Sequence, residues 1–206
     1  MSYQSLINQL ILQGYLKTSR IIQAFKKIDR TDFLPADLRD EAGGNYPLSI
    51  GHGQTISQPL TVAFIIELLK PEVGDKILDV GSGSGWTTAI LAEIVGEKGK
   101  VYGLEVVPEL KEMGEDNVRK YNFKNVKFYL GNGWKGLEAY SPYDRILISA
   151  ACPEIPQSLK DQLKIGGRIV APVGAYPQSI VKLDKISKDK FKKEKHPGFV
   201  FVPLVE

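Results

Sequence analysis

The sequence is poor in the residues that form covalent cross-links and metal sites. Its 206 residues include one cysteine, Cys152, and two histidines, His52 and His196. A single cysteine excludes an internal disulfide and fits a reducing intracellular compartment, so we expect a cytoplasmic protein. The histidines lie far apart and neither belongs to a metal-ligand motif such as HExxH, so we expect no metal site.

Long apolar segments and a strong net charge are also lacking. No segment approaches the roughly 18 apolar residues needed to span a bilayer, so we expect no membrane partner. The net charge is +3, and the lysines responsible are concentrated in residues 182–195. Acidic and apolar positions interrupt that run, which favours a solvated hairpin over a nucleic-acid-binding patch.

The length suits one compact domain with a single sizeable core. Apolar residues recur at helical spacing between 6 and 28, which predicts two short amphipathic helices that cap the main domain. Residues 30–58 are rich in glycine and proline with little periodicity, and we interpret them as a long irregular segment. We therefore divide the single domain, 1–206, into N-terminal helices with a loop (1–58) and an α/β core (59–206).

Strands and helices are expected to alternate through that core. The first predicted helix begins at Pro59 and ends before Pro71. Three further helices are predicted at 87–95, 109–121 and 157–163. The predicted strands cover 76–80, 100–104, 126–130, 145–149 and 168–172, and residues 179–187 and 198–203 close the chain as an antiparallel pair. Such alternation predicts a doubly wound, mostly parallel sheet with helices on both faces.

A glycine-rich turn follows the first predicted strand and reads Asp-Val-Gly-Ser-Gly-Ser-Gly over 79–85. Its glycines allow a tight turn and close approach of the backbone to a ligand. Asp79 would repel a pyrophosphate but suits a cationic ligand, and Glu105 ends the second strand, where a carboxylate can accept both hydroxyls of a ribose. S-adenosylmethionine has a ribose and a sulfonium but no phosphate. The turn therefore favours a methyltransferase over a dehydrogenase. The alternative that the turn binds no ligand at all is kept.

The segment 51–59, Gly-His-Gly-Gln-Thr-Ile-Ser-Gln-Pro, precedes an apolar helix. Serine is a preferred N-cap and proline is tolerated in the first helical turn, so Ser57 is a candidate cap of the helix that begins at Pro59. The same polar loop lies ahead of the glycine turn, which also makes Ser57 a candidate for the chemistry. The two interpretations are compatible.

Six segments together resemble one known family. They are Gly51–Pro59, Leu78–Gly85, Ala150–Pro156, Leu163–Arg168, Pro172–Gly174 and Phe201–Leu204. From about Leu6 to Val205 the chain resembles the protein-L-isoaspartate O-methyltransferases, which are S-adenosylmethionine-dependent class I methyltransferases with a Rossmann-like fold. The first segment is highly specific to that family, whereas the glycine turn is shared with most class I methyltransferases.

The resemblance implies methylation of the free α-carboxylate of L-isoaspartyl residues in damaged proteins and peptides, with S-adenosyl-L-homocysteine as the product. The methyl ester then closes to a succinimide, which hydrolyses partly to normal aspartate and so repairs the chain. A carboxylate with a pKa of about 4 is ionised at neutral pH and needs no general base. Ser57, which matches the family's active-site serine, is therefore expected to orient the acceptor and not to attack it.

The resemblance also assigns the neighbouring site residues. Thr55, Ile56 and Gln58 are expected to shape the substrate loop around Ser57. The residues expected to bind S-adenosylmethionine are Asp79, Gly81, Ser82, Gly83, Glu105, Val106, Asn132 and Gly133. Within that set, Glu105 is expected at the ribose, and Asn132 and Gly133 are expected near the adenine.

The chain departs from the family pattern at two asparagines. Asn132 lies in Gly-Asn-Gly where the family usually has Gly-Asp-Gly, which predicts a weaker bond to the adenine amino group. Asn45 lies where the family often has an aspartate, which predicts a looser or differently shaped loop. These departures leave open a catalytically silent binding module.

Two further functions are compatible with the predicted fold, a class I methyltransferase acting on a different carboxylate and a nucleic-acid methyltransferase. The second is disfavoured because the sequence has neither paired cysteines nor an Asn-Pro-Pro-Tyr loop for a flipped base. We expect a monomer that acts on isoaspartyl proteins and peptides and not on nucleic acid.

Overall fold

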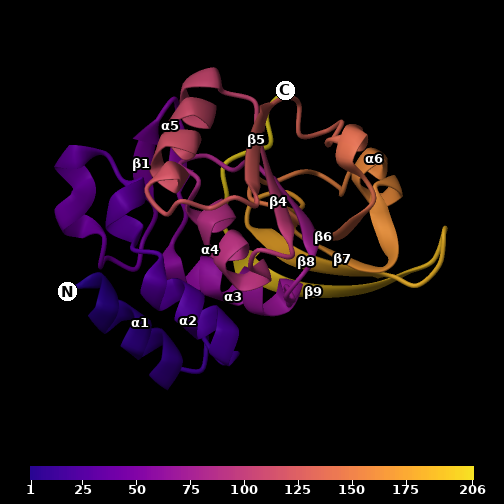
Figure 1. Cartoon of the computed structure of the whole chain (residues 1–206). Helices are drawn as coiled ribbons and strands as arrows, with labels where there is room; N and C mark the ends of the chain where they lie inside the picture. Colours follow the sequence, from indigo (N-terminus) through magenta and orange to yellow (C-terminus); the bar gives the residue numbers. More distant parts are fainter.

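The computed structural model describes residues 1–206 and is built around a seven-stranded sheet with the order β5-β4-β3-β6-β7-β8-β9 (Figure 1). The strands are β3 (Lys76–Val80), β4 (Lys100–Glu105), β5 (Val126–Leu130), β6 (Tyr143–Ile148), β7 (Leu163–Val173), β8 (Gln178–Lys185) and β9 (Phe191–Phe199). The first five are parallel, and β8 and β9 are antiparallel to their neighbours. The predicted mostly parallel, Rossmann-like sheet with a C-terminal antiparallel pair is confirmed.

The strand order reverses at β3. The chain moves outward from β3 to β4 and β5, then returns to lay β6 on the other side of β3. In doubly wound sheets, ligands bind at the carboxyl ends of the strands where the order reverses. Both Asp79 and Glu105 lie at that end of the sheet.

The helices cover the two faces of the sheet unequally. They are α1 (Tyr3–Leu12), α2 (Ser19–Lys27), α3 (Pro59–Leu69), α4 (Trp86–Val95), α5 (Pro108–Arg119) and α6 (Gln157–Asp161). One apolar cluster of 35 buried residues joins α1 to α5 with one face of the sheet, while a cluster of 14 lies on the face that carries α6. Adjacent residues Ile77 and Leu78 belong to different clusters, as alternation along a strand buried on both faces requires.

Residues 30–58 are more regular than predicted. They form two short 3₁₀ helices, η1 (Arg30–Phe33) and η2 (Ala36–Glu41), and a hairpin of β1 (Leu48–Gly51) and β2 (Gln54–Ile56). The hairpin turns through Gly51, His52 and Gly53, which all have positive φ, of 86°, 53° and 71°. The expectation of an irregular segment was wrong because elements this short carry too few residues to show a period.

The position of the last strand was also predicted wrongly. Residues 198–203 were expected to form it, but β9 ends at Phe199 and only Pro203 makes an isolated bridge, to Ala151. The lysine-rich run forms the β8–β9 hairpin, with Lys185 opposite Phe191, so the hairpin predicted for residues 182–195 is confirmed. Lysines along an exposed edge strand obscure the apolar alternation that identifies a strand, while they protect its free edge from pairing with other chains.

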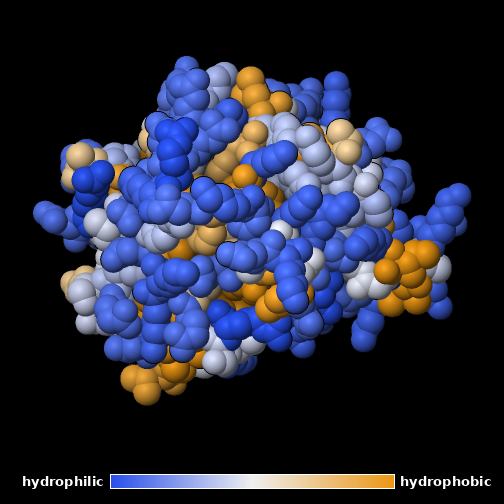
Figure 2. Space-filling model, in the orientation of Figure 1, coloured by the Kyte–Doolittle hydropathy of each residue, from blue (hydrophilic) through white to orange (hydrophobic).

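The surface is mostly polar. Figure 2 shows one face as largely hydrophilic, with small apolar patches that stay separate from one another. Scattered patches of this kind are normal for a folded domain. None of the helices combines the length and the apolar character that crossing a membrane would require.

Two glycines, Gly85 and Gly114, allow the glycine turn to approach α5 closely. A Cβ on Gly114 of α5 would lie 2.9 Å from the carbonyl oxygen of Gly83 and 3.0 Å from the Phe128 ring. A Cβ on Gly85 would lie 2.8 Å from the carbonyl oxygen of Gly114. The turn is therefore held against α5 at a separation that side chains would not permit.

Replacement of Gly114 by alanine tests this packing. In an open helix the change would gain about 1 kcal/mol from helix propensity, but overpacking against a backbone carbonyl costs about 1–3 kcal/mol. We expect Gly114→Ala to lower the melting temperature by several degrees in calorimetry, because each kcal/mol corresponds to roughly 2–4 °C at this size. Glu112→Ala, at an exposed position of the same helix, serves as the control. A melting temperature raised by Gly114→Ala would contradict the close approach.

Candidate active site

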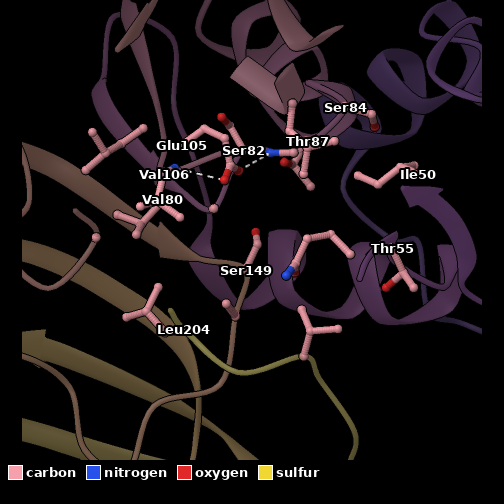
Figure 3. Close-up of a pocket in the computed structure, with 18 of the residues that line it drawn as sticks. Ile50, Thr55, Val80, Ser82, Ser84, Thr87, Glu105, Val106, Ser149 and Leu204 are labelled. Carbon is pink, nitrogen blue, oxygen red and sulfur yellow. Dashed lines mark hydrogen bonds between the residues drawn. The ribbon is translucent and has the colours of Figure 1, made fainter. Parts of the chain in front are cut away.

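A cavity with about 730 Å³ of empty space opens at the carboxyl ends of β3, β4 and β6. Its wall is formed by residues 54–57 from the hairpin, 80–84 from the glycine turn, 104–106 after β4 and 202–205 from the C-terminal segment. Figure 3 shows side chains from these separate elements facing one space.

Glu105 is the only charged residue in that wall. Its carboxylate is 6% exposed and accepts three backbone hydrogen bonds, to Oε2 from the N–H of Gly83 at 2.8 Å and to Oε1 from Val106 at 2.9 Å and Val107 at 3.1 Å. Figure 3 shows the bonds to Gly83 and Val106 as dashed lines. A carboxylate offers about four acceptor positions, so one position on Oε2 remains for a ligand hydroxyl.

Asp79 does not line the cavity. Its side chain is fully buried, and Oδ2 accepts hydrogen bonds from the hydroxyls of Thr87 at 2.8 Å and Thr88 at 2.6 Å in the first turn of α4. Its other oxygen, Oδ1, has no partner. Burial raises the pKa of the Asp79 carboxyl to about 6, against the opposing effect of the two threonine bonds. Asp79 therefore joins β3 to α4 through these hydrogen bonds. It does not contact a ligand in the cavity, but its charge affects the electrostatic potential there.

Two cavity hydroxyls lack partners. The Oγ atoms of Ser82 and Ser149 are buried without any hydrogen bond, although both residues line the cavity. Buried polar atoms in proteins are nearly always paired. These hydroxyls, together with the free position on Glu105, fit a ligand that carries several polar groups.

Ser57 lies between β2 and α3, and its hydroxyl makes no hydrogen bond within the protein. The expectation that Ser57 caps α3 was wrong, because the N-cap position is held by Gln58. Pro59 has no N–H that needs a partner. The next backbone N–H, that of Leu60, donates to Asn45 Oδ1 at 3.0 Å. The start of the helix is thus completed by a side chain from a distant loop.

Ser57 also marks the junction between two hollows. It lines the cavity and an adjoining open groove, which is bordered by Tyr15, Phe64 and Phe199. Thr55 lines both as well. A residue at this boundary can contact both a ligand in the cavity and a second molecule in the groove.

Hydrogen bonds to Asn45 hold the substrate loop in place. Gln58 lines the groove, and its amide Nε2 donates to the Asn45 carbonyl oxygen at 3.0 Å. Ile56 lines the cavity and is 4% exposed. The Asn45 side chain also ties the loop to the start of α3, and the looser or differently shaped loop expected at Asn45 stays a prediction.

The expected adenine residues are placed differently from each other. Gly133 lines the cavity, where a Cβ would lie 2.7 Å from Val80 and 2.9 Å from Leu204. Asn132 is half-buried outside the wall, and its Oδ1 accepts the backbone N–H of Trp134 at 2.8 Å. Its contact with an adenine stays a prediction.

Nine of the expected site residues line the cavity, and three do not. The nine are Thr55, Ile56, Ser57, Gly81, Ser82, Gly83, Glu105, Val106 and Gly133. Asp79 and Asn132 lie behind the wall, and Gln58 lines only the groove.

The sequence interpretation missed the C-terminal segment as part of the wall. Backbone bonds from Ala151 N to Val202 O at 2.7 Å and from Leu204 N to Ala151 O at 2.8 Å hold it beside the loop that follows β6. Trp134 Nε1 adds a bond to Leu204 O at 3.3 Å. The available signal was that Ala150–Pro156 and Phe201–Leu204 belong to the segments that resemble the family.

Comparison with known sequences identifies relatives along the whole chain. A family model described as protein-L-isoaspartate(D-aspartate) O-methyltransferase matches residues 1–206. The protein-L-isoaspartate O-methyltransferase of Methanococcus aeolicus is 44% identical over 202 residues, which cover 98% of this chain and 93% of that protein. The protein of the same name from Methanopyrus kandleri is 42% identical over 204 residues, which cover 98% and 90%.

Solved structures agree. A structure named protein-L-isoaspartate O-methyltransferase superposes with a TM-score of 0.90 at 27% identity and covers 99% of this chain and 66% of that chain. A crystal structure from Plasmodium falciparum, whose description names the same methyltransferase in complex with S-adenosyl-L-homocysteine, superposes with a TM-score of 0.88. At 24% identity, over 100% of this chain and 99% of that chain, it shows the shared fold.

The raised pKa of Asp79 predicts a pH-dependent stability. An unfolded aspartate titrates at about 3.9, so between about pH 4 and pH 6 the folded protein binds the additional proton and its stability falls as the pH rises. Above about pH 6 the buried charge destabilises the protein to a constant extent. We expect Asp79→Asn to raise the melting temperature most near pH 8 and about half as much near pH 5, as measured by calorimetry in matched buffers at those two pH values.

Asp189→Asn, in the exposed turn between β8 and β9, provides the control and should change the melting temperature equally little at both pH values. An equal increase for Asp79→Asn at both pH values would contradict the assignment of the buried charge.

Proposed function

The chain belongs to the protein-L-isoaspartate(D-aspartate) O-methyltransferase family, and from that premise we propose how its residues divide the reaction between them. The enzyme transfers a methyl group from S-adenosyl-L-methionine to the free α-carboxylate of L-isoaspartyl residues in proteins and peptides. S-adenosyl-L-homocysteine leaves as the product. The observation that carries our assignment is the unpartnered Ser57 hydroxyl at the boundary between the cavity and the groove.

The cavity fits S-adenosyl-L-methionine. That cofactor supplies an electrophilic methyl group on a positively charged sulfur. Glu105 has one acceptor position free for a ribose hydroxyl, and the Ser82 and Ser149 hydroxyls lack partners. No lysine or arginine lines the cavity, and the charge of Asp79 lies just behind the wall, so the local field favours a cation.

The acceptor enters from the groove. Its carboxylate is already an anion at neutral pH, so the protein must orient it and need not deprotonate it. In our proposal the Ser57 hydroxyl donates a hydrogen bond to one carboxylate oxygen and directs the other oxygen toward the cavity. Orientation of two reactants can supply roughly 7–11 kcal/mol of the barrier reduction.

The loop around Ser57 is suited to this task. Ile56 is buried below it, and Gln58 is tied to Asn45, which itself fixes the start of α3. Thr55 lines both hollows beside Ser57. A hydroxyl held on such a loop loses little conformational freedom when it binds a substrate.

The proposed division of the chain falls between the substrate loop and α3. We propose one methyltransferase domain in which residues 1–58 supply the N-terminal helices and the substrate loop. Residues 59–206 supply the α/β core that binds S-adenosyl-L-methionine, and they also contribute Phe64 and Phe199 to the groove. Support comes from the 35-residue apolar cluster, which includes residues of both parts. A cytoplasmic location, a monomeric state and the absence of a nucleic-acid partner remain predictions, and sedimentation and filter-binding measurements would test the last two.

Replacement of Ser57 by alanine tests the assignment. We expect Ser57→Ala to lower kcat on an isoaspartyl peptide by about 10- to 100-fold, because removing one positioning hydrogen bond leaves the acceptor poorly aligned. The affinity for S-adenosyl-L-homocysteine, measured by calorimetry, should change less than about threefold, since the bond is made to the acceptor. The rate would be followed as base-labile methyl ester formed from labelled cofactor.

Ser49→Ala is a matched control, since Ser49 lies on the same hairpin but is exposed outside both hollows. The aspartyl form of the same peptide controls for the acceptor, and its methylation at an equal rate would favour a different carboxylate substrate. Full turnover by Ser57→Ala would remove Ser57 from the mechanism.

A further inference from the structure

Arg30 is fully buried yet has no carboxylate partner. Its guanidinium donates four hydrogen bonds to backbone carbonyl oxygens instead. Nη1 donates to Ala42 at 3.3 Å and to Gly44 at 2.9 Å, and Nη2 donates to Tyr46 at 2.9 Å and to Ser57 at 3.2 Å. All four accepting residues lie outside the helices and strands, so Arg30 supplies the hydrogen-bond donors that the backbone of this segment lacks.

The same guanidinium lies over the wall of the cofactor cavity. Its central carbon is 5.5 Å from the centroid of the Trp86 ring, and Trp86 both begins α4 and lines the cavity. Tyr3 and Phe25 pack edge-on against that ring at centroid distances of 6.2 and 6.0 Å. Arg30 therefore connects the substrate loop on one side with a rigid aromatic group of the cavity on the other.

A buried cation of this kind is tolerated only when its surroundings are well ordered. Burial lowers the pKa of the Arg30 guanidinium to about 10, which leaves it charged at neutral pH. An uncompensated charge in this position would be strongly destabilising, so the carbonyl groups must stay where they are. The planar fork of arginine holds them in fixed directions, which a lysine ammonium cannot do.

We propose that Arg30 is a positioning residue for methyl transfer. Through the bond to the Ser57 carbonyl oxygen, and through its cation–π contact with Trp86, it fixes the Ser57 side chain relative to the methyl donor in the cavity. This inference rests on the proposed role of Ser57. Arg30 itself touches neither substrate nor cofactor.

The first test is Arg30→Lys, which keeps the charge but loses the fork. We expect kcat on an isoaspartyl peptide to fall roughly 10- to 100-fold, because displacement of a reacting group by about 1 Å can cost that much. The KM for the peptide and the affinity for S-adenosyl-L-homocysteine should each stay within about threefold of wild type, since the binding surfaces are retained.

A double-mutant cycle separates positioning from general stability. If Arg30 acts through the Ser57 hydroxyl, Arg30→Lys should reduce kcat less than about threefold in a Ser57→Ala background, because the group it positions is gone. Multiplicative losses in the double variant would overturn the proposal. Hydrogen exchange of the amides of 45–57 should also become faster in Arg30→Lys, and unchanged exchange would equally count against it.

Arg145→Lys is the matched control. Arg145 also donates to backbone carbonyl oxygens, those of Leu69, Lys70 and Asp144, but it lies at the opposite end of α3 from Ser57. We expect this variant to melt at a lower temperature and to keep wild-type kcat. A loss of kcat in Arg145→Lys equal to that in Arg30→Lys would show that lost carbonyl bonds act through stability alone.

Folding of each variant would be verified by circular dichroism and by binding of S-adenosyl-L-homocysteine. Should Arg30→Lys fail that check, Arg30→Gln, which retains a planar donor, would be measured by the same cycle. Wild-type turnover by Ser57→Ala would overturn the assignment of Ser57 and this proposal together. A slow Ser57→Ala with a fully active Arg30→Lys would overturn the role of Arg30 alone.

Discussion

The hydrogen bond between the Gly83 N–H and the Glu105 carboxylate connects the two strand ends between which the cofactor cavity forms. β3 and β4 are neighbours in the sheet, but the segments that follow them diverge toward α4 and α5. Glu105 bridges that divergence by accepting from the turn after β3 and from Val106 and Val107 after β4. Without it the positive-φ glycines would be free to adopt other conformations, since glycine gains most from disorder.

On the acceptor side, a buried positive charge, that of Arg30, orders the backbone as the Glu105 carboxylate does beside the cavity. Arg30 donates to carbonyl oxygens where Glu105 accepts from amides, and each buried ion satisfies backbone groups that no helix or strand includes. Charge-assisted hydrogen bonds are stronger than neutral ones, so one ion can order several residues of irregular chain. Trp86 lies between the two systems, because it lines the cavity and carries the Arg30 guanidinium on its face.

These two ions also explain how far the sequence alone could predict the structure. The strands β3 and β5 were predicted at their observed bounds. Burial on both faces gives β3 a nearly continuous apolar run, and the edge strand β5 keeps enough apolar residues between turn residues to be identified. The segment 30–58 and the wall formed by 202–205 were not, because their order comes from Arg30 and from backbone bonds to Ala151, contacts between residues far apart in sequence. Periodicity reports local burial and carries no information about such contacts. The family resemblance, confirmed by the match over 1–206, supplied Ser57 and eight more of the 24 residues that line the cavity, but not the contacts that hold them.

The wrong prediction of a capping role for Ser57 identifies what the loop has been arranged to do. A helix start leaves about four N–H groups without partners, and a serine next to it would ordinarily satisfy one of them. Here Pro59 removes one donor, and Asn45 accepts the next from Leu60. The Ser57 hydroxyl is thereby released from the helix while its backbone is still fixed by Arg30. A side chain that is free to form hydrogen bonds, on a backbone that is not free to move, is what orientation of an already ionised carboxylate requires.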